Sequence, residues 1–242
     1  MDSIWNQLVS LDSDTWSAAG RSLWFAATSC AISIIICFPL GSLIHFRQFR
    51  GKGLLVSVLQ SLYCMPTVLV GLLVFSMLSR AGPMGELGWL FSPNAIIFGQ
   101  AVLISPIMMG LVISAYSGVD KSITETAVSL GASKLQMVIV AVREAKYAML
   151  TLVIIGFSRA ISELGISMMV GGNINFYTRT LTTAISLETQ KGNIEKAWAM
   201  GILLLLIALV INITIYSLQK SGRLKRLNLF RRILPVTQSR SG

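Results

Sequence analysis

Long apolar stretches separated by short polar ones form the main pattern of this chain. Five stretches reach the roughly 20 residues that a helix needs to cross a bilayer. They cover residues 22–44, 54–78, 95–116, 147–170 and 197–218. The pattern predicts an all-α integral membrane protein with five transmembrane helices in a domain over 22–218. An outer N-terminal segment, 1–21, and a basic tail, 219–242, flank that domain.

The composition agrees with this pattern. Of the 242 residues, 54% are hydrophobic and only 12% charged, and the mean hydropathy is +0.71. A soluble domain of this size carries far more charge. The net charge of +10 could suggest nucleic acid, but the basic residues flank apolar stretches. We therefore expect contact with membrane lipids and no nucleic-acid partner.

The basic residues also predict an orientation. Fourteen Lys and Arg residues lie in the first loop, the third loop and the tail, against five in the N-terminal segment and the other two loops. The positive-inside rule then places the N-terminus outside and the C-terminus in the cytoplasm. All five Trp residues fall on the predicted outer side, as interfacial Trp would. The loop 118–146 is therefore expected to be cytoplasmic.

This third loop contains signals for two helices. Ser122 and Glu125 form a capping-box pattern, which predicts a short helix starting near Ile123. Gly131 can adopt the positive φ that ends a helix, and Ser133 can cap a second helix running toward the next span. We expect a short surface helix joined to a long one at a glycine.

Prolines and cysteines modify the spans. Pro66 and Pro106 each remove a backbone donor within a predicted span, so a kink or break is expected there. Cys30, Cys37 and Cys64 have no His or acidic neighbours in the sequence, so we interpret them as small apolar core residues. No metal site and no plausible nucleophile with a base is evident, which argues against an enzyme.

Two charged residues lie inside the fourth span. Arg159 and Glu163 are four residues apart and share one helix face. A charge at that depth costs about 2.5 to 3.5 kcal/mol. Two interpretations stay open: an ion pair that holds the helix bundle together, or a pathway element in which Arg159 binds an oxyanion and Glu163 holds and releases it.

The segment after the fourth span is rich in hydrogen-bond donors. Gly171, Gly172 and Asn173 form a corner that a gate could use. Hydroxyl groups then surround Arg179 at Thr178, Thr180, Thr182 and Thr183. This set suits a tetrahedral oxyanion, the docking of an external protein, or a solvated re-entrant helix over 174–192.

Glu125, Ala127 and Gly131 resemble the coupling-helix motif of ABC importer permeases, although the proline that follows in that motif is missing. The stretch 156–188 is more specific. Its pattern resembles the molybdate, sulfate and tungstate group of these permeases, and most of all the tungstate permeases. The matching residues are Gly156, Phe157, Arg159, Ala160, Glu163, Gly165, Met169, Gly171, Gly172, Asn173, Thr178–Ile185, Leu187 and Glu188.

This resemblance implies a type I importer permease in the inner membrane of a prokaryote. It implies a homodimer, two ATPase subunits that bind ATP and Mg, and an extracytoplasmic substrate-binding protein. No cofactor is expected on this chain, which also lacks a phosphate-binding loop. The expected cargo is an oxyanion, tungstate first, with molybdate or sulfate as alternatives. A self-sufficient anion channel or secondary carrier is the alternative of another class.

Overall fold

The computed structural model describes residues 12–233, and all regular elements within this range are helices, as predicted. Eleven elements follow one another along the chain. They are α2 (Ser13–Phe46), α3 (Lys52–Ser61), η1 (Leu62–Cys64), α4 (Thr67–Leu78), η2 (Gly85–Leu87), α5 (Pro93–Ser117), α6 (Lys121–Ser129), α7 (Lys134–Ile161), α8 (Gly165–Gly171), α9 (Leu181–Gln190) and α10 (Ile194–Ile233).

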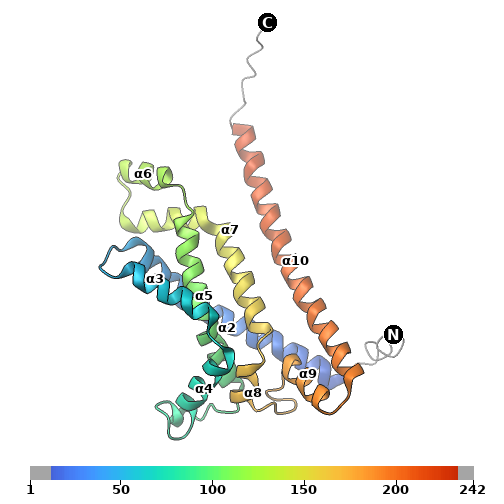
Figure 1. Ribbon diagram of the computed structural model, residues 1–242. Coiled ribbons are helices and arrows are strands. Elements are labelled where there is room, and N and C mark those ends of the chain that lie inside the picture. Colours follow the sequence, from blue (N-terminus) through green and yellow to red (C-terminus); the bar gives the residue numbers. More distant parts are fainter. Residues whose placement is uncertain (1–11, 234–242) are drawn as a thin grey trace.

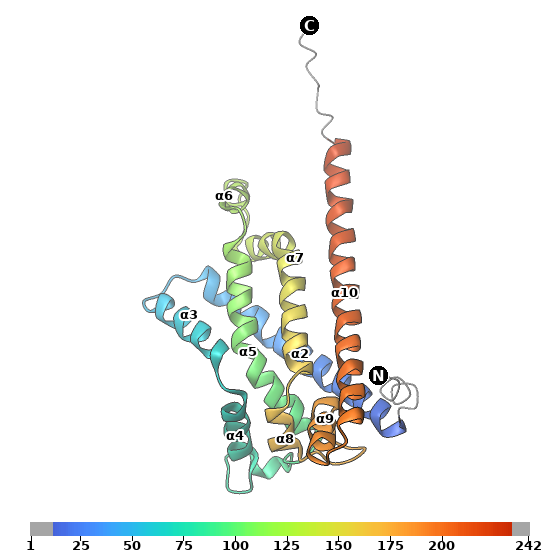
Figure 2. The ribbon, with the colours of Figure 1, turned by 45° about the vertical axis from the view of Figure 1, so that its right-hand side comes forward.

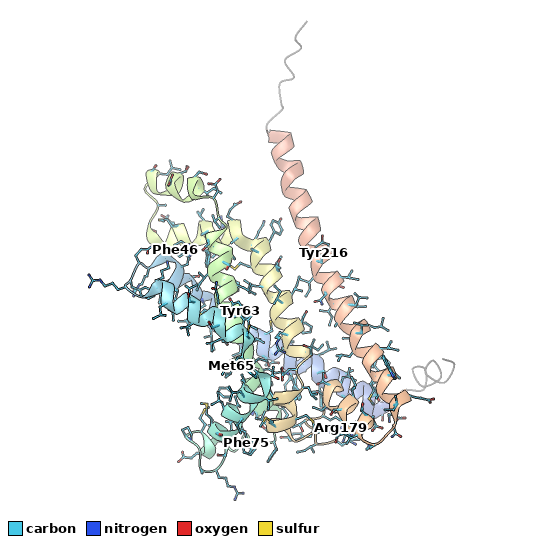
Figure 3. All side chains as sticks on the ribbon, in the orientation of Figure 1. Phe46, Tyr63, Met65, Phe75, Arg179 and Tyr216 are labelled. Carbon is cyan, nitrogen blue, oxygen red and sulfur yellow. The ribbon has the colours of Figure 1, made fainter. Side chains whose placement is uncertain are left out.

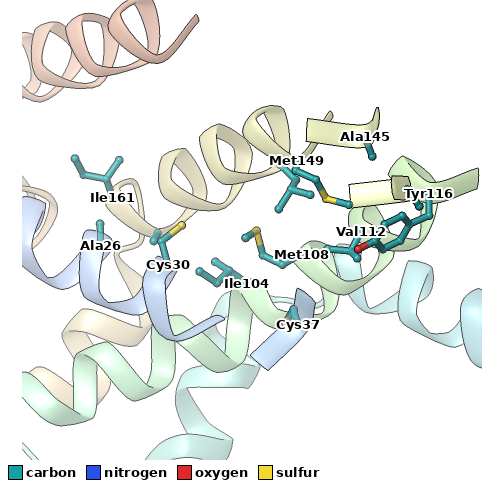
Figure 4. Close-up of a cluster of buried hydrophobic side chains, with 13 residues drawn as sticks. Ala26, Cys30, Cys37, Ile104, Met108, Val112, Tyr116, Ala145, Met149 and Ile161 are labelled. Carbon is teal, nitrogen blue, oxygen red and sulfur yellow. The ribbon is translucent and has the colours of Figure 1, made fainter. Parts of the chain in front are cut away.

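Helix α5 lies at the centre, packed against α2, α7 and α8. Small and apolar side chains from α2, α5 and α7 interlock in the largest buried cluster (Figure 4). Cys30 and Cys37 belong to this cluster, as expected. Cys64 does not: it lies exposed at the end of η1, where the backbone is about to leave the helix. Its predicted core position is therefore wrong.

Three described helices are long and apolar enough to cross a membrane: α2, α5 and α10 up to Ser217. The second predicted span is a bent pair, because the chain bends by 101° between α3 with η1 and α4. The bend lies at Met65 and Pro66, which have extended backbones. The break predicted at Pro66 is confirmed. Pro106 produces no break, since α5 continues through it.

The fourth predicted span is not one helix. Helix α7 ends at Ile161 and the short helix α8 starts at Gly165. In a continuous helix, the Ile166 N–H would bond to the carbonyl of residue 162. It donates instead to the Glu163 carboxylate, over 3.1 Å. A side chain thus replaces the backbone acceptor and allows the chain to turn.

Both ends of the described chain are more helical than expected. Helix α2 starts at Ser13, so residues 13–21 of the predicted N-terminal segment belong to the same helix as the first span. Residues 1–11 lie outside the described part. Helix α10 runs on past position 219 to Ile233 without a break, and the rest of the predicted basic tail, 234–242, also lies outside the described residues.

The elements that carry the predicted coupling residues and the threonine-rich segment lie at opposite ends of the bundle. In two views, α6 and the start of α7 lie at one end, while α4, α8 and α9 lie at the other (Figures 1 and 2). Figure 3 marks the first end by Phe46 and the second by Phe75 and Arg179. Tyr63 and Met65, at the bend of the second span, lie between them.

Candidate functional site

The third loop forms the predicted pair of helices at one end of the molecule. Its first helix, α6, begins at Lys121, two residues earlier than expected. The predicted Ser122 capping box is wrong, because the Ser122 N–H donates to the Asp120 carboxylate over 2.9 Å. This backbone hydrogen bond lowers the pKa of Asp120 below its usual value. Glu125 lies exposed on the surface of α6.

Gly131 ends α6 as predicted, with φ of +79°. The Ala132 N–H reaches back to the Ala127 carbonyl over 3.0 Å, which is the long hydrogen bond of a Schellman motif. Ser133 and Gln136 then form a capping box at the start of α7. Hydrogen bonds on both sides of Gly131 therefore fix an elbow, and Leu130 projects from it with 83% of its surface exposed.

Arg159 and Glu163 form the ion pair that their spacing allows, with 3.0 Å between Nη1 and Oε2. The two side chains differ in exposure: 32% for Arg159 and 2% for Glu163. The second carboxylate oxygen of Glu163 holds the Ile166 N–H at the start of α8. The carboxylate is thus buried with two donors, whereas the guanidinium keeps an open side.

Glu163 also lies where the two broken spans meet. Its backbone carbonyl accepts hydrogen bonds from Thr182 of α9, over 2.9 Å, and from Ser167 of α8, over 3.3 Å. A side chain at Gly165 would reach both the Glu163 carboxylate and the Thr67 hydroxyl, since these atoms are 3.3 and 3.0 Å from its Cβ position. Thr67 is the first residue of α4. The break at Pro66 therefore adjoins the break at Glu163.

The threonines of segment 171–183 form most of their hydrogen bonds within that segment. Thr178 is fully buried, donates to the Gly171 carbonyl and accepts from the Ile174 N–H. Thr180 and Thr183 are also buried and form the capping box that starts α9. Of the four, Thr182 alone is partly exposed. These hydroxyls shape the segment and cap α9, which packs against α10 at the same end of the bundle as α4 and α8 (Figure 1).

Arg179 connects the same segment to the start of the chain. Its guanidinium contacts Asn173 over 3.2 Å and Asp14 over 2.9 Å, and Arg21 donates to its backbone carbonyl over 2.8 Å. Asp14 could not be identified as a partner of Arg179 from the sequence, because no local pattern links residues that lie 165 positions apart. The same holds for Thr67, which the fold brings beside Glu163.

The two glycines at the corner play different parts. Gly172 has φ of +69°, a conformation that favours glycine. Gly171 is tightly packed, since a Cβ there would lie 2.6 Å from Ile96. Within residues 12–233, no three His, Cys, Asp or Glu side chains gather closely enough to hold a metal ion.

Comparison with known proteins identifies a family. Residues 37–222 match the family described as binding-protein-dependent transport system inner membrane component. A tungstate uptake system permease protein of Peptoclostridium acidaminophilum is 41% identical over 88% of this chain and 93% of its own length. The corresponding protein of Campylobacter jejuni is 34% identical over 88% and 90%. A molybdenum transport system permease of Escherichia coli is 26% identical over 86% and 97%.

Solved structures agree with this assignment. A bacterial ABC transporter that imports the acidic polysaccharide alginate superimposes with a TM-score of 0.69 and 17% identity, covering 91% of this chain and 83% of that one. An inward-facing methionine ABC transporter gives 0.66 and 17%, with coverage of 84% and 94%. The fold is thus that of an ABC importer permease. The chain belongs to the family of inner membrane components of binding-protein-dependent transport systems.

Proposed function

We propose that this chain is the membrane subunit of an ATP-driven importer whose cargo is an oxyanion, tungstate first. The identity of 41% and 34% to two tungstate uptake permeases, over most of each chain, carries this proposal. The relatives named for molybdenum transport are 24 to 27% identical. Molybdate is therefore the first alternative cargo, and sulfate is a second alternative that rests on the resemblance alone.

In the proposed topology the chain crosses the membrane five times. The second and fourth crossings are the broken pairs α3–α4 and α7–α8. The N-terminus lies outside and the C-terminus in the cytoplasm of a prokaryotic cell. The basic loops support this orientation. It places the α6 elbow on the side where ATP is found, and α8 and α9 on the side from which cargo arrives.

Two copies of the chain and two ATPase subunits form the proposed assembly. Each ATPase subunit binds ATP and Mg and holds one elbow, with Glu125, Ala127 and Gly131 as the coupling residues. The exposed Leu130 supports this role, since an apolar side chain at the tip of a polar loop suits a partner's surface. An extracytoplasmic binding protein docks at the outer end, near α8 and α9.

Arg159 is the proposed cargo contact within the pathway. Its guanidinium is a forked donor suited to oxyanions, and a third of its side chain is open. When an anion binds the Arg159 guanidinium, the Glu163 carboxylate still accepts the hydrogen bond from the Ile166 N–H. Glu163 is then positioned to draw the guanidinium back and release the anion. The outer segment from Gly171 to Thr183 is the proposed gate above this pair.

The transport cycle follows from these positions. Closure of the ATPase subunits on ATP draws the elbows together, and α7 carries the movement to the break at Glu163. The cavity then opens outward and receives the anion from the binding protein. ATP hydrolysis returns it to the inward-facing state. A self-sufficient channel or carrier would need none of these partners.

The native mass of the gently extracted complex tests the assembly. The tagged chain is co-expressed with the proteins encoded beside it. We expect two copies of this chain with two copies of an ATPase. A chain that is purified alone and still moves an anion without ATP would instead favour the channel or carrier.

Uptake competition tests the cargo separately. Cells with the complete system take up labelled tungstate in the presence of excess molybdate or sulfate. We expect unlabelled tungstate to compete best and sulfate least. Equal competition by molybdate would show that the importer does not distinguish the two anions. The proposed assembly would not be affected by that result.

A further inference from the structure

A cavity of about 620 Å³ lies between the last two turns of α2 and the first turns of α7. Its walls are mainly apolar. They include Pro39, Leu43 and Phe46 of α2 and Met137 and Val138 of α7, and Arg47 lies at the rim. Figures 1 and 3 show the first turns of α7 running across this end of the bundle, near Phe46. The cavity therefore has an apolar body and a single cationic edge.

The cavity continues an exposed apolar stripe on α2. Ile32, Ile36, Leu40 and Leu43 recur every three or four residues, and between 37 and 48% of each side chain is exposed. This spacing places them on one helix face. Arg47 follows Leu43 by four residues, so the stripe leads to a guanidinium. An occupant of this surface must be apolar along its length and anionic at one end.

The backbone around Arg47 is fixed, although its side chain is free. The Arg47 N–H donates to the Leu43 carbonyl over 3.1 Å. The Lys52 ammonium donates to the carbonyls of His45 and Arg47, over 2.6 and 3.2 Å. Within the described residues, no acidic side chain forms an ion pair with Arg47. The guanidinium is therefore available to an external anion.

We propose that this cavity binds an anionic phospholipid of the inner leaflet, with an acyl chain against Leu43 and Val138 and the phosphate on Arg47. Assignment to the inner leaflet rests on the orientation proposed above. Charge complementarity and the continuous apolar stripe both favour such a lipid. Met137 lies one turn after Ser133, so the site adjoins the elbow that the ATPase is proposed to hold.

Lipid retention by the full chain tests this proposal. The chain is extracted with its co-expressed partners and placed in nanodiscs of phosphatidylcholine, with or without phosphatidylglycerol. Native mass spectrometry then measures the lipid retained per copy. We expect phosphatidylglycerol to be retained in preference to phosphatidylcholine. Arg47→Gln should weaken this retention about tenfold, through the loss of a charge-assisted contact, whereas Arg50→Gln in the same exposed loop should not.

A second variant examines the apolar part of the site. Val138→Phe fills the cavity and leaves Arg47 in place, so it should also reduce retention. Equal retention in all variants would overturn the proposal. So would a lipid-free dimer that a thiol-specific crosslinker joins through Leu43→Cys, because a second copy would then cover the stripe. Nanodiscs expose both faces, so these outcomes do not depend on whether the proposed topology and cargo are right.

Discussion

Gly131 holds the elbow in a conformation that other residues adopt at a cost. Its φ is +79°, and a Cβ at this position would meet no atom within 4 Å. A substitution there therefore acts through backbone strain and not through a clash. For most residues that strain is about 1–2 kcal/mol, and it is larger for β-branched side chains.

We expect Gly131→Val to distort the elbow and to reduce tungstate uptake several-fold while ATP hydrolysis continues. The ratio of uptake to hydrolysis in proteoliposomes measures this uncoupling. Gly131→Asn is the matched control, because asparagine tolerates positive φ, and it should retain most of the coupling. An unchanged ratio in the valine variant would remove the coupling role from this elbow.

Variants of Arg159 and Glu163 can distinguish the two interpretations of their ion pair, namely a structural contact or a binding site for the anion. Removing one partner of a fully buried pair costs about 3–5 kcal/mol. Here the cost should be smaller, because a third of Arg159 is exposed. Arg159→Gln should therefore lower the amount of assembled complex, and Arg159→Gln with Glu163→Gln should restore it.

Transport by the double variant then decides the role of the pair. Restored assembly without uptake would support a contact with the anion. Restoration of both assembly and uptake would show that the ion pair has only a structural role. Assembly can be measured by size-exclusion chromatography of the detergent extract, and uptake with labelled tungstate.

At the scale of elements, the hydropathy pattern predicts α5, the membrane part of α10 and the end of α2 within a few residues, but it places the start of α2 nine residues too late. It misses the break in the fourth span, since an average over 20 residues does not register one carboxylate that takes over a backbone hydrogen bond. The break depends on hydrogen bonds from Ile166 and Thr182 to Glu163, and these bonds form only when the chain folds.

The threonines of the outer segment show a similar limit. The sequence shows where hydroxyl groups lie along the chain, but not which of them form hydrogen bonds within the protein. Thr180 and Thr183 are three residues apart, which is the capping-box spacing, and this local signal could have identified the start of α9. The contact between Arg179 and Asp14 depends on the whole fold, and no local pattern reveals it.

The corner between α9 and α10 should be sensitive to acid. Glu188 accepts hydrogen bonds from Asn193 over 2.8 Å and from Lys191 over 3.0 Å, and the bond from Asn193 is the main cause of its lowered pKa. A carboxylate with a lowered pKa stabilises the fold above its ordinary pKa of 4.5, and this contribution is lost as the pH falls through the lower, folded-state value.

Glu188→Gln should therefore melt below the natural protein at neutral pH, by about 2 °C, and the difference should shrink below pH 4.5. Thermal unfolding of the purified protein across this pH range measures the difference. Glu195→Gln, on an exposed residue of the first turn of α10, serves as the control and should show no such trend. A difference independent of pH would contradict the assignment.

At the scale of the whole molecule, the proposed orientation predicts which positions reagents can reach. Cys30, Cys37 and Cys64 are first replaced. Single cysteines are then introduced at Gln48, in the loop after α2, and at Gln190, the last residue of α9. Both residues are exposed, and they lie on opposite predicted sides of the membrane. In intact cells, a membrane-impermeant maleimide should label position 190. Position 48 should react only after permeabilisation, and the reverse pattern would invert the topology.

Helix α10 has a mechanical consequence for this molecule. Its 40 residues make a rod about 60 Å long, roughly twice the thickness of the hydrocarbon core. The rod starts at the corner with α9, at the end of the bundle that holds the proposed gate (Figure 1). A tilt of about 5° at that corner displaces the far end by about 5 Å. In the proposed topology, a probe at the far end of α10 would therefore report a small movement at the α9 corner as a larger displacement on the opposite face of the membrane.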